Sequence, residues 1–264
     1  MFKLAITGKG GVGKTTLAAL LSRLFASEGR GVLAIDADPD ANLASAIGFS
    51  PDAASLITPI VELKDLIEER TGAKPGSSAP FFRLNPKVDD IPDRFGGVHA
   101  GVKLVEMGTV KTGGAGCVCP ENVLLKQFLR YVLVNRPEVV IVDMEAGIEH
   151  LGRGTAESVD ALIVVVEPGR RSLQTAETIK RLAADIGLNR CFVVGSKVTT
   201  DESREFIVKA LLDLPIIGFL SYSERIVEAD LKGLSPYDMD GNAVWEARQI
   251  RDRLVELLGR QQSD

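Results

Sequence analysis

Short hydrophobic runs recur along the chain, and longer stretches with helical spacing separate them. The runs span four to six residues and are rich in β-branched side chains; they cover residues 3–7, 32–35, 102–105, 139–142, 161–166, 191–194 and 216–219. Near-continuous apolar runs are typical of strands in a parallel sheet whose two faces are both covered. The pattern therefore predicts a buried, mostly parallel β-sheet.

Stretches with helical spacing lie between these runs. They cover residues 14–28, 61–71, 121–134, 172–186, 202–212, 223–231 and 243–259. Regular alternation of strand and helix is typical of an α/β fold in which a doubly wound sheet carries helices on both faces. We see no internal repeat and no dividing linker, so we expect residues 1–264 to form a single domain. Residues 72–80 are predicted to be an insertion loop.

The composition and charge of the chain argue against several classes of protein. The 264 residues contain 31 Lys and Arg against 36 Asp and Glu, which gives a net charge of −5. A general binder of nucleic acid or anionic membrane would be basic, so we expect neither partner. No apolar run reaches the roughly 18–20 residues that span a bilayer, and we see no secretory signal. We therefore expect a cytoplasmic protein whose three cysteines form no disulfide framework.

Residues 8–15 match the phosphate-binding pattern G-x-x-x-x-G-K-[ST]. The pattern lies between the first predicted strand and the first predicted helix, as a phosphate loop requires. Its glycines let backbone N–H groups surround an anion, and the helix dipole adds to the attraction. Lys14 is expected to reach the β- and γ-phosphates of a nucleotide and Thr15 to hold Mg²⁺. The predicted nucleotide-binding residues of this loop are Gly8, Lys9, Gly10, Gly11, Val12, Gly13, Lys14, Thr15 and Thr16.

Acidic side chains follow two of the predicted strands. Asp36 and Asp38 come directly after residues 32–35, and Asp143 ends the fourth apolar run. Ligands bind at the carboxyl ends of the strands in open α/β sheets, so we expect these side chains near the phosphate loop. A carboxylate after an apolar strand is the Walker B arrangement, which holds Mg²⁺ directly or through water. The simpler interpretation of residues 36–40 is a turn that favours Asp and Pro.

The sharpest local feature is the pair Cys117 and Cys119, in a predicted insertion near residues 112–122. Cysteines at i and i+2 of an extended segment point to one side, so both thiolates can bind one ion. A second copy of the chain, related by a two-fold axis, would supply the other two ligands of a four-coordinate site. Thiolates suit Zn²⁺, Ni²⁺, Cu⁺ or an iron–sulfur cluster. The alternatives are two free thiols or a redox pair, although a disulfide at this spacing is strained.

Lys9 directly follows the first glycine and extends the motif to K-G-G-x-G-K-T. The extended motif resembles the deviant phosphate loop of the MinD, ParA and nitrogenase-iron-protein class of ATPases. The resemblance implies ATP hydrolysis coupled to homodimerisation, with Lys9 reaching the partner's nucleotide. It also implies that Asp38 orients the attacking water, that Asp36 supports Mg²⁺ and that the N–H of Gly147 meets the γ-phosphate. Lys9, Lys14 and Asp38 are then the catalytic residues.

Three further segments narrow the resemblance: residues 36–42, 116–122 and 143–155. Together with the phosphate loop they look like the CooC-type accessory ATPases, a family that assists nickel insertion into carbon monoxide dehydrogenase. The resemblance covers most of the chain. It implies ATP or ADP with Mg²⁺, a homodimer that binds Ni²⁺ or Zn²⁺ between its subunits through the cysteine pair, and carbon monoxide dehydrogenase as the client.

Two other functions stay open at this point. An iron–sulfur ATPase that transfers electrons would also place cysteines at a dimer axis, but the cluster cysteines of the nitrogenase iron protein are widely separated in sequence. A MinD- or ParA-like positioning ATPase is the second alternative, and division-site members of that class carry a C-terminal amphipathic helix for membranes. The last predicted helix has an apolar face made of Trp245, Ile250, Leu254, Leu257 and Leu258. Mixed charges around this face favour a helix packed on the core.

Several positions keep open questions. Ser196 stands where relatives usually carry an asparagine that reads adenine. Glu145 and His150 follow Asp143 closely, and the sequence assigns no role to either. Cys191 lies in an apolar run and is expected in the core. The residues do not choose the physiological metal, nor do they distinguish delivery of the ion from remodelling of the client.

Overall fold

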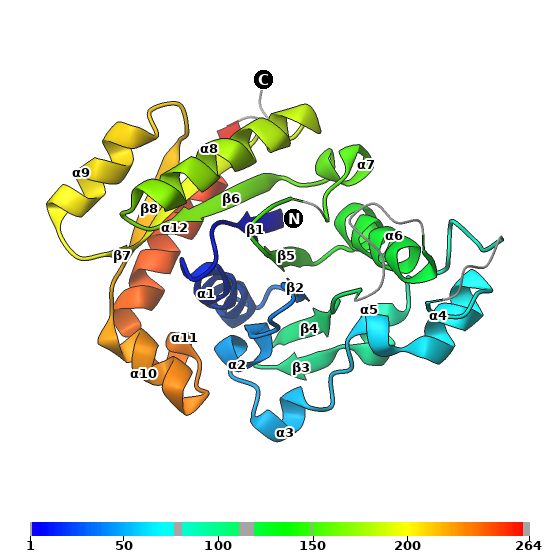
Figure 1. Cartoon of the computed structure of the whole chain (residues 1–264). Helices are drawn as coiled ribbons and strands as arrows, with labels where there is room; N and C mark the ends of the chain where they lie inside the picture. The colour runs from blue at the N-terminus through cyan, green and yellow to red at the C-terminus, as the bar shows by residue number, and fades with distance from the viewer. Residues whose placement is uncertain (1, 77–80, 111–118, 149, 261–264) are drawn as a thin grey trace.

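The computed structural model describes residues 2–76, 81–110, 119–148 and 150–260, and these residues form an eight-stranded sheet covered by helices (Figure 1). The strands are β1 (Lys3–Thr7), β2 (Val32–Ala37), β3 (Gly97–His99), β4 (Val102–Glu106), β5 (Val139–Met144), β6 (Ala161–Val166), β7 (Cys191–Val198) and β8 (Ile216–Ser221). Their order across the sheet is β3-β4-β2-β5-β1-β6-β7-β8. Every neighbouring pair is parallel except β3 with β4. The predicted α/β class and the mostly parallel sheet are confirmed.

Helices cover both faces of the sheet (Figure 1). The described helices are α1 (Lys14–Ser27), α2 (Leu43–Ile47), α3 (Pro51–Ala54), α4 (Lys64–Thr71), α5 (Ile91–Phe95), α6 (Pro120–Asn135), α7 (Arg153–Ala156), α8 (Arg170–Asp185), α9 (Asp201–Ala210), α10 (Glu224–Lys232), α11 (Pro236–Met239) and α12 (Gly241–Arg260), with a 3₁₀ turn η1 (Ile60–Glu62). On one face α6 and α8 bring Phe128 and Leu173 into the core. On the other face α1 and α12 contribute Phe25 and Ile250. The strands between these layers are buried on both sides, which is why they are apolar throughout.

The structure contains elements that the hydrophobic pattern does not predict. β3 has three residues, all at least partly exposed, so no apolar run marks it. The helices α2, α3, α5, α7 and α11 have four or five residues, too short to show a helical period. The helix predicted over residues 61–71 instead divides at Leu63 (φ −78°, ψ 67°) into η1 and α4.

The C-terminal helix α12 packs on the core, as its charge pattern predicts. Ile250, Leu254 and Leu258 are buried, and a Cβ on Gly218 of β8 would lie only 2.5 Å from Ile250 Cγ1. Trp245 differs from the prediction, because 60% of its surface is exposed and it does not belong to the buried face. In the part of the chain that the structure describes, no helix has the length and apolar character needed to cross a membrane.

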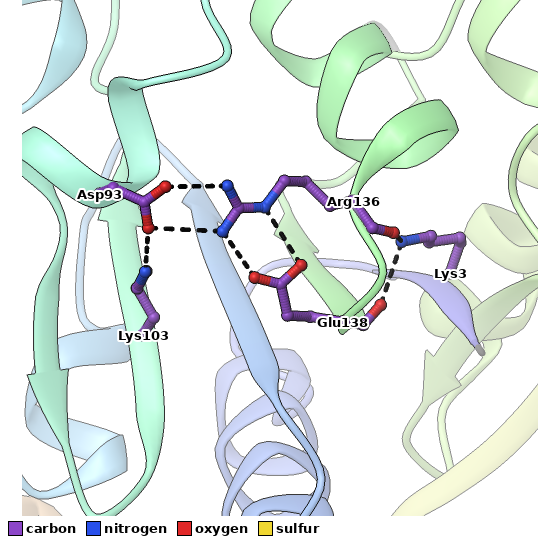
Figure 2. A network of polar contacts seen from close by, with 5 residues as sticks. All are labelled: Lys3, Asp93, Lys103, Arg136 and Glu138. Carbon is purple, nitrogen blue, oxygen red and sulfur yellow. Dashed lines mark hydrogen bonds and ion pairs between the residues drawn. The ribbon is translucent and has the colours of Figure 1, made fainter.

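A network of charged side chains ties the amino ends of several strands together (Figure 2). Arg136, between α6 and β5, pairs with Asp93 of α5 at 3.0 Å and with Glu138 at 2.5 Å. Asp93 also pairs with Lys103 of β4. Lys3 Nζ donates hydrogen bonds to the carbonyl oxygens of Arg136 (2.5 Å) and Glu138 (3.0 Å). The network therefore fixes the start of β5 relative to β1 and β4.

The carboxyl ends of the same strands bring the predicted site together. β2, β5 and β1 are neighbours in the sheet, and Asp36 lies opposite Asp143 in the β2–β5 register. Thr7 ends β1, and the phosphate loop follows it directly. Because parallel strands end at one edge of a sheet, the phosphate loop and both carboxylates meet there.

Candidate nucleotide-binding site

The phosphate loop spans residues 8–13 between β1 and α1. Gly8 (φ 147°) passes so close to β6 that a Cβ would lie 2.3 Å from the carbonyl oxygen of Val165. Gly13 precedes α1 in a left-handed conformation (φ 98°), which side chains other than glycine rarely adopt. The first turn of α1 contains no acidic residue. Its free N–H groups and its dipole therefore favour an anion at the loop.

Lys14 and Asp38 lie together, although 24 positions separate them in the sequence. Lys14 Nζ is 3.5 Å from Asp38 Oδ2, and both side chains are largely buried. A buried ammonium group requires a counter-charge, and in this structure Asp38 supplies it. The predicted phosphate-binding lysine and the predicted water-orienting carboxylate therefore lie in direct contact.

Thr15 and Asp143 form the second close pair. Thr15 Oγ1 donates a hydrogen bond to Asp143 Oδ2 at 2.6 Å. Asp143 Oδ1 is buried and accepts no hydrogen bond from the described residues. Burial raises the pKa of Asp143 to about 7, while the Thr15 hydroxyl and the charge of Lys14 act in the opposite direction. A hydroxyl oxygen beside a carboxylate oxygen without a partner is a donor set that fits Mg²⁺.

Asp36 holds the segment that carries Asp38. Its Oδ1 accepts a hydrogen bond from the N–H of Asp38 (3.1 Å), and its Oδ2 accepts one from the N–H of Leu43 (2.9 Å). Burial, together with the negative charge of Asp143, raises the pKa of Asp36 to about 8. In this arrangement Asp36 orients residues 38–43 and lies opposite the carboxylate expected to bind Mg²⁺.

Gly147 lies in a turn that is bound to the end of β1. Thr7 Oγ1 donates to the carbonyl oxygens of Glu145 and Gly147, both at 2.8 Å. The N–H of Gly147 donates to the carbonyl oxygen of Glu145 at 2.8 Å within the turn. The family resemblance predicts that this N–H binds a γ-phosphate instead. The turn must therefore open before this N–H can bind a phosphate.

Lys9 forms an ion pair within the chain. Its Nζ lies 3.5 Å from Glu167 Oε1, directly after β6. Val12 and Thr16 of the predicted set differ in position: Val12 is fully buried in the core, whereas Thr16 lines the cleft beside the loop.

The loop faces a cleft of about 630 Å³, a size ordinary for small-molecule sites. Its wall combines the phosphate loop, residues 38–46, Glu145 and the α10–α11 region. Residues that the sequence did not single out for this wall are Asp40, Asn42, Ser45, Ala46, Ala146, Ile226, Val227, Asp230, Leu234 and Pro236. α10 and α11 follow the phosphate loop by about 200 residues without a motif, so only the fold brings them to the cleft.

Lys197 is a further cleft residue that sequence reasoning did not predict. It has a positive φ of 55°, and its Nζ donates to the carbonyl oxygen of Gly11 at 2.5 Å. The preceding Ser196 is buried, and its Oγ would lie 3.0 Å from a Cβ on Gly13. The unusual Ser-Lys pair thus packs directly on the phosphate loop.

The cysteine pair is only partly described. Cys117 lies outside the described residues, whereas Cys119 is the residue before α6 and is partly exposed. Glu121, in the first turn of α6, is buried, and its Oε1 accepts a hydrogen bond from the N–H of Gly76 at 2.6 Å. Among the described residues, no three His, Cys, Asp or Glu side chains are grouped to hold a metal ion. Cys191 lies buried in β7, as expected, and burial raises its pKa to about 11.

Comparison with known proteins agrees with this geometry. Residues 3–237 match the CobQ/CobB/MinD/ParA nucleotide-binding domain. The chain is 47% identical over 257 residues to the carbon monoxide dehydrogenase accessory protein CooC of Rhodospirillum rubrum, with 97% of each chain covered. It is 44% identical over 257 residues to an uncharacterised ATP-binding protein of Methanocaldococcus jannaschii, with 97% of this chain and 98% of that protein covered.

Solved structures show the same fold at lower identity. A chain of the MinC:MinD cell division protein complex from Aquifex aeolicus is similar with a TM-score of 0.69, and 97% of this chain and 96% of that chain are covered. The sequence identity is 21%, so this likeness concerns the fold alone. The sequence match and the fold agree, and the chain therefore belongs to the CobQ/CobB/MinD/ParA family of P-loop nucleotide-binding proteins, in which it is CooC-like.

Proposed function

We propose that this protein is an ATPase that assists nickel insertion into carbon monoxide dehydrogenase and works as a homodimer. The observation that carries the proposal is the 47% identity to CooC over 97% of both chains, because that protein is named as a carbon monoxide dehydrogenase accessory protein. The cleft at the carboxyl ends of β1, β2 and β5 supports the ATPase part. We further propose that residues 1–264 form one cytoplasmic P-loop domain with the cysteine pair in an insertion near residues 112–122.

ATP is the substrate of the proposed reaction. As its phosphates enter the loop, Lys14 exchanges the carboxylate of Asp38, now 3.5 Å away, for the β- and γ-phosphate oxygens. Asp38 is thereby released close to the γ-phosphate, where it can accept a hydrogen bond from water and orient that water for attack. The turn at Gly147 opens, and its N–H donates to the γ-phosphate. Hydrolysis removes this contact, which lets the turn close again.

Thr15 and Asp143 are the residues that we expect to hold Mg²⁺. The buried Asp143 Oδ1 has no partner among the described residues, and Thr15 already lies 2.6 Å from the other oxygen. The bound ion would neutralise charge on the β- and γ-phosphate oxygens. Asp36 positions this region from the neighbouring strand, since it holds the backbone of Asp38.

The proposed dimer joins two ligands across one interface. Lys9 would reach the partner's nucleotide, and Cys117 and Cys119 from both subunits would supply four thiolates for one Ni²⁺ or Zn²⁺. The metal ion is cargo in this proposal. ATP and the metal both favour the dimer, so each must raise the affinity of the other by the same factor.

A metal titration of the reduced, anaerobic protein tests the proposal. We expect Ni²⁺ to produce thiolate-to-metal absorption that saturates at one ion per dimer, with the dimer mass confirmed by sedimentation. Cys119→Ser should lose the absorption and keep nucleotide binding, because Cys119 lies outside the nucleotide cleft. Cys191→Ala is the matched control, since it removes a buried thiol of β7 and should keep the metal.

Stoichiometric nickel binding by Cys119→Ser would refute the thiolate site, and hydrolysis without any dimer would refute the coupling. A protein purified with iron and sulfide would favour the electron-transfer alternative instead. A division-site regulator would need a C-terminal helix that can leave the core for a membrane, whereas α12 buries Ile250, Leu254 and Leu258. ATP-dependent binding to liposomes would reverse that preference.

A further inference from the structure

Lys9 occupies a definite position in the single subunit. Its Nζ lies 3.5 Å from Glu167 Oε1, and the two side chains are 39% and 30% exposed. Within the described residues, Glu167 is the carboxylate paired with this lysine. The phosphate loop begins with Gly8 pressed against Val165 of β6, two residues before Glu167. Lys9 is therefore placed beside the end of β6 by the backbone itself.

Glu167 is held firmly by its own backbone. Its N–H donates to Ser172 Oγ at 3.1 Å, and Ser172 is a buried residue in the first turn of α8. The carboxylate therefore projects from a short connection between β6 and α8 that is fixed at both ends. The backbone N–H of Glu167 thus makes the contact with α8, and its carboxylate makes the ion pair with Lys9.

The two positions of Lys9 exclude each other. An ammonium group that pairs with Glu167 of its own subunit cannot at the same time reach a phosphate on the partner. We propose that Glu167 is a positioning residue that retains Lys9 on its own subunit and thereby sets the ATP concentration at which the dimer forms. This inference rests on the proposed ATP-linked homodimer and names the residue that opposes it.

The size of the effect follows from the exposure of the pair. An exposed ion pair changes an equilibrium by up to about fivefold, and a symmetric dimer must break two of them. Removing the carboxylate should therefore tighten the ATP-bound dimer by about three- to thirty-fold. Salt screens exposed charges, so the gain should shrink when ionic strength rises from about 0.05 M to about 0.5 M.

The test measures the dimer dissociation constant by sedimentation in a saturating, non-hydrolysable ATP analogue. Glu167→Gln keeps the backbone bond to Ser172 and should tighten the dimer. Its affinity for the analogue should stay unchanged at protein concentrations low enough to keep the chain monomeric, whereas the analogue concentration needed for dimerisation should fall. Glu167→Asp keeps the charge and should restore a value nearer the wild type. Glu205→Gln removes an exposed ion pair with Lys209 on α9 and is the matched control. Combined with Lys9→Ala, Glu167→Gln should have no further effect, because the pair is already broken.

A dimer constant for Glu167→Gln within twofold of Glu205→Gln would overturn the inference, and so would a weaker dimer or a gain that persists in the Lys9→Ala background. In these cases the wild type still dimerises, and the proposed function stands. A wild type that binds the analogue and remains monomeric at every concentration would overturn the proposed homodimer together with this inference.

Discussion

At the scale of single residues, the candidate site keeps its charges in contacts that a nucleotide and a cation would replace. Lys14 pairs with Asp38, and Lys9 pairs with Glu167. Burial raises the pKa of both Asp143 and Asp36, and the charge of Asp143 raises that of Asp36 further. The two lysines have counter-charges in the nucleotide-free chain, whereas Asp143 Oδ1 has no hydrogen-bond partner among the described residues. A phosphate would therefore replace the carboxylate partners of the lysines, and a cation would bind the open oxygen of Asp143.

Asp38→Ala should separate nucleotide binding from hydrolysis. The variant loses the carboxylate that we expect to orient water, so hydrolysis should fall by about 10²- to 10⁴-fold. Lys14 no longer has its internal partner, so ATP should bind at least as well as to the wild type and collect in an ATP-bound dimer. Single-turnover hydrolysis and sedimentation measure the two effects. Asp213→Ala, at an exposed aspartate far along the chain, should change neither. Wild-type hydrolysis by Asp38→Ala would refute the assignment.

Asp143 should make the stability of the metal-free protein depend on pH. Its pKa is about 7 in the folded chain and about 4 in an unfolded one. Between these values the folded state binds more protons, so the free energy of unfolding should fall as pH rises from about 4 to about 7. Asp143→Asn removes this titration. The unfolding free energy of the variant minus that of the wild type should therefore rise by about 2–3 kcal/mol between pH 5 and pH 8.

Urea unfolding of both proteins across this pH range, with Mg²⁺ and nucleotide removed, measures that difference. Asp213→Asn is the control, because its exposed carboxyl should leave the pH profile as it is in the wild type. Parallel profiles for Asp143→Asn and the wild type would show that Asp143 is ionised in the folded chain, contrary to the prediction.

Sequence motifs located only some of the site residues. Lys14, Thr15 and Asp143 belong to patterns whose spacing follows from the geometry of a phosphate loop and a strand end, so they could be predicted. Lys197 could not, because its contact with Gly11 depends on a positive φ and on the placement of β7. The partner of Lys9 was equally hidden, since no local rule relates residues 158 positions apart.

At the scale of elements, long periodic segments were predictable and short ones were not. All seven predicted strands form, and β1, β2, β5 and β6 are continuously apolar up to their ends because both of their faces are buried. β4 and β8, nearer the edges of the sheet, keep partly exposed positions. β3 and the four- or five-residue helices carry no such signal, and their positions depend on packing. α2 is the important omission, since Asp36 binds its first N–H, at Leu43, and its residues line the cleft.

Arg136→Ala should weaken the network that anchors β5. Hydrogen bonds from Arg136 and Lys103 lower the pKa of Asp93 to about 2, and Asp93 and Glu138 in turn raise the pKa of Arg136. The variant should lose about 1–3 kcal/mol of unfolding free energy at pH 7, because partly buried charge-assisted hydrogen bonds are removed. Since the pKa of Asp93 is depressed, this contribution is present above about pH 4 and is lost as pH falls towards 2.

Chemical denaturation at pH 7 and near pH 3 checks this expectation. Arg130→Ala, at an exposed arginine of the same helix α6, is the matched control and should stay within about 0.5 kcal/mol of the wild type. An equal loss in both variants, or a loss for Arg136→Ala that does not shrink in acid, would show that the network does not stabilise the fold in this way.

At the scale of the whole molecule, the order of the strands decides how the parts work together. Placing β1 between β5 and β6 brings the phosphate loop beside Asp143 on one side and Glu167 on the other. The segment from β5 through α7 to β6 thus touches the loop at both of its ends. A nucleotide at the loop would therefore lie close to both Asp143, which we propose holds Mg²⁺, and Lys9, which we propose reaches a second subunit.

The sequence by itself determined the α/β class, the phosphate loop and the carboxylates at the strand ends, because these follow from local rules of burial, spacing and backbone conformation. Only the tertiary structure decided which distant groups pair: Lys14 with Asp38, Lys9 with Glu167, and Lys197 with the loop. It also decided that α10 and α11 close the nucleotide cleft. Such contacts depend on strand order and on crossovers of many residues, and no pattern within a short segment encodes them.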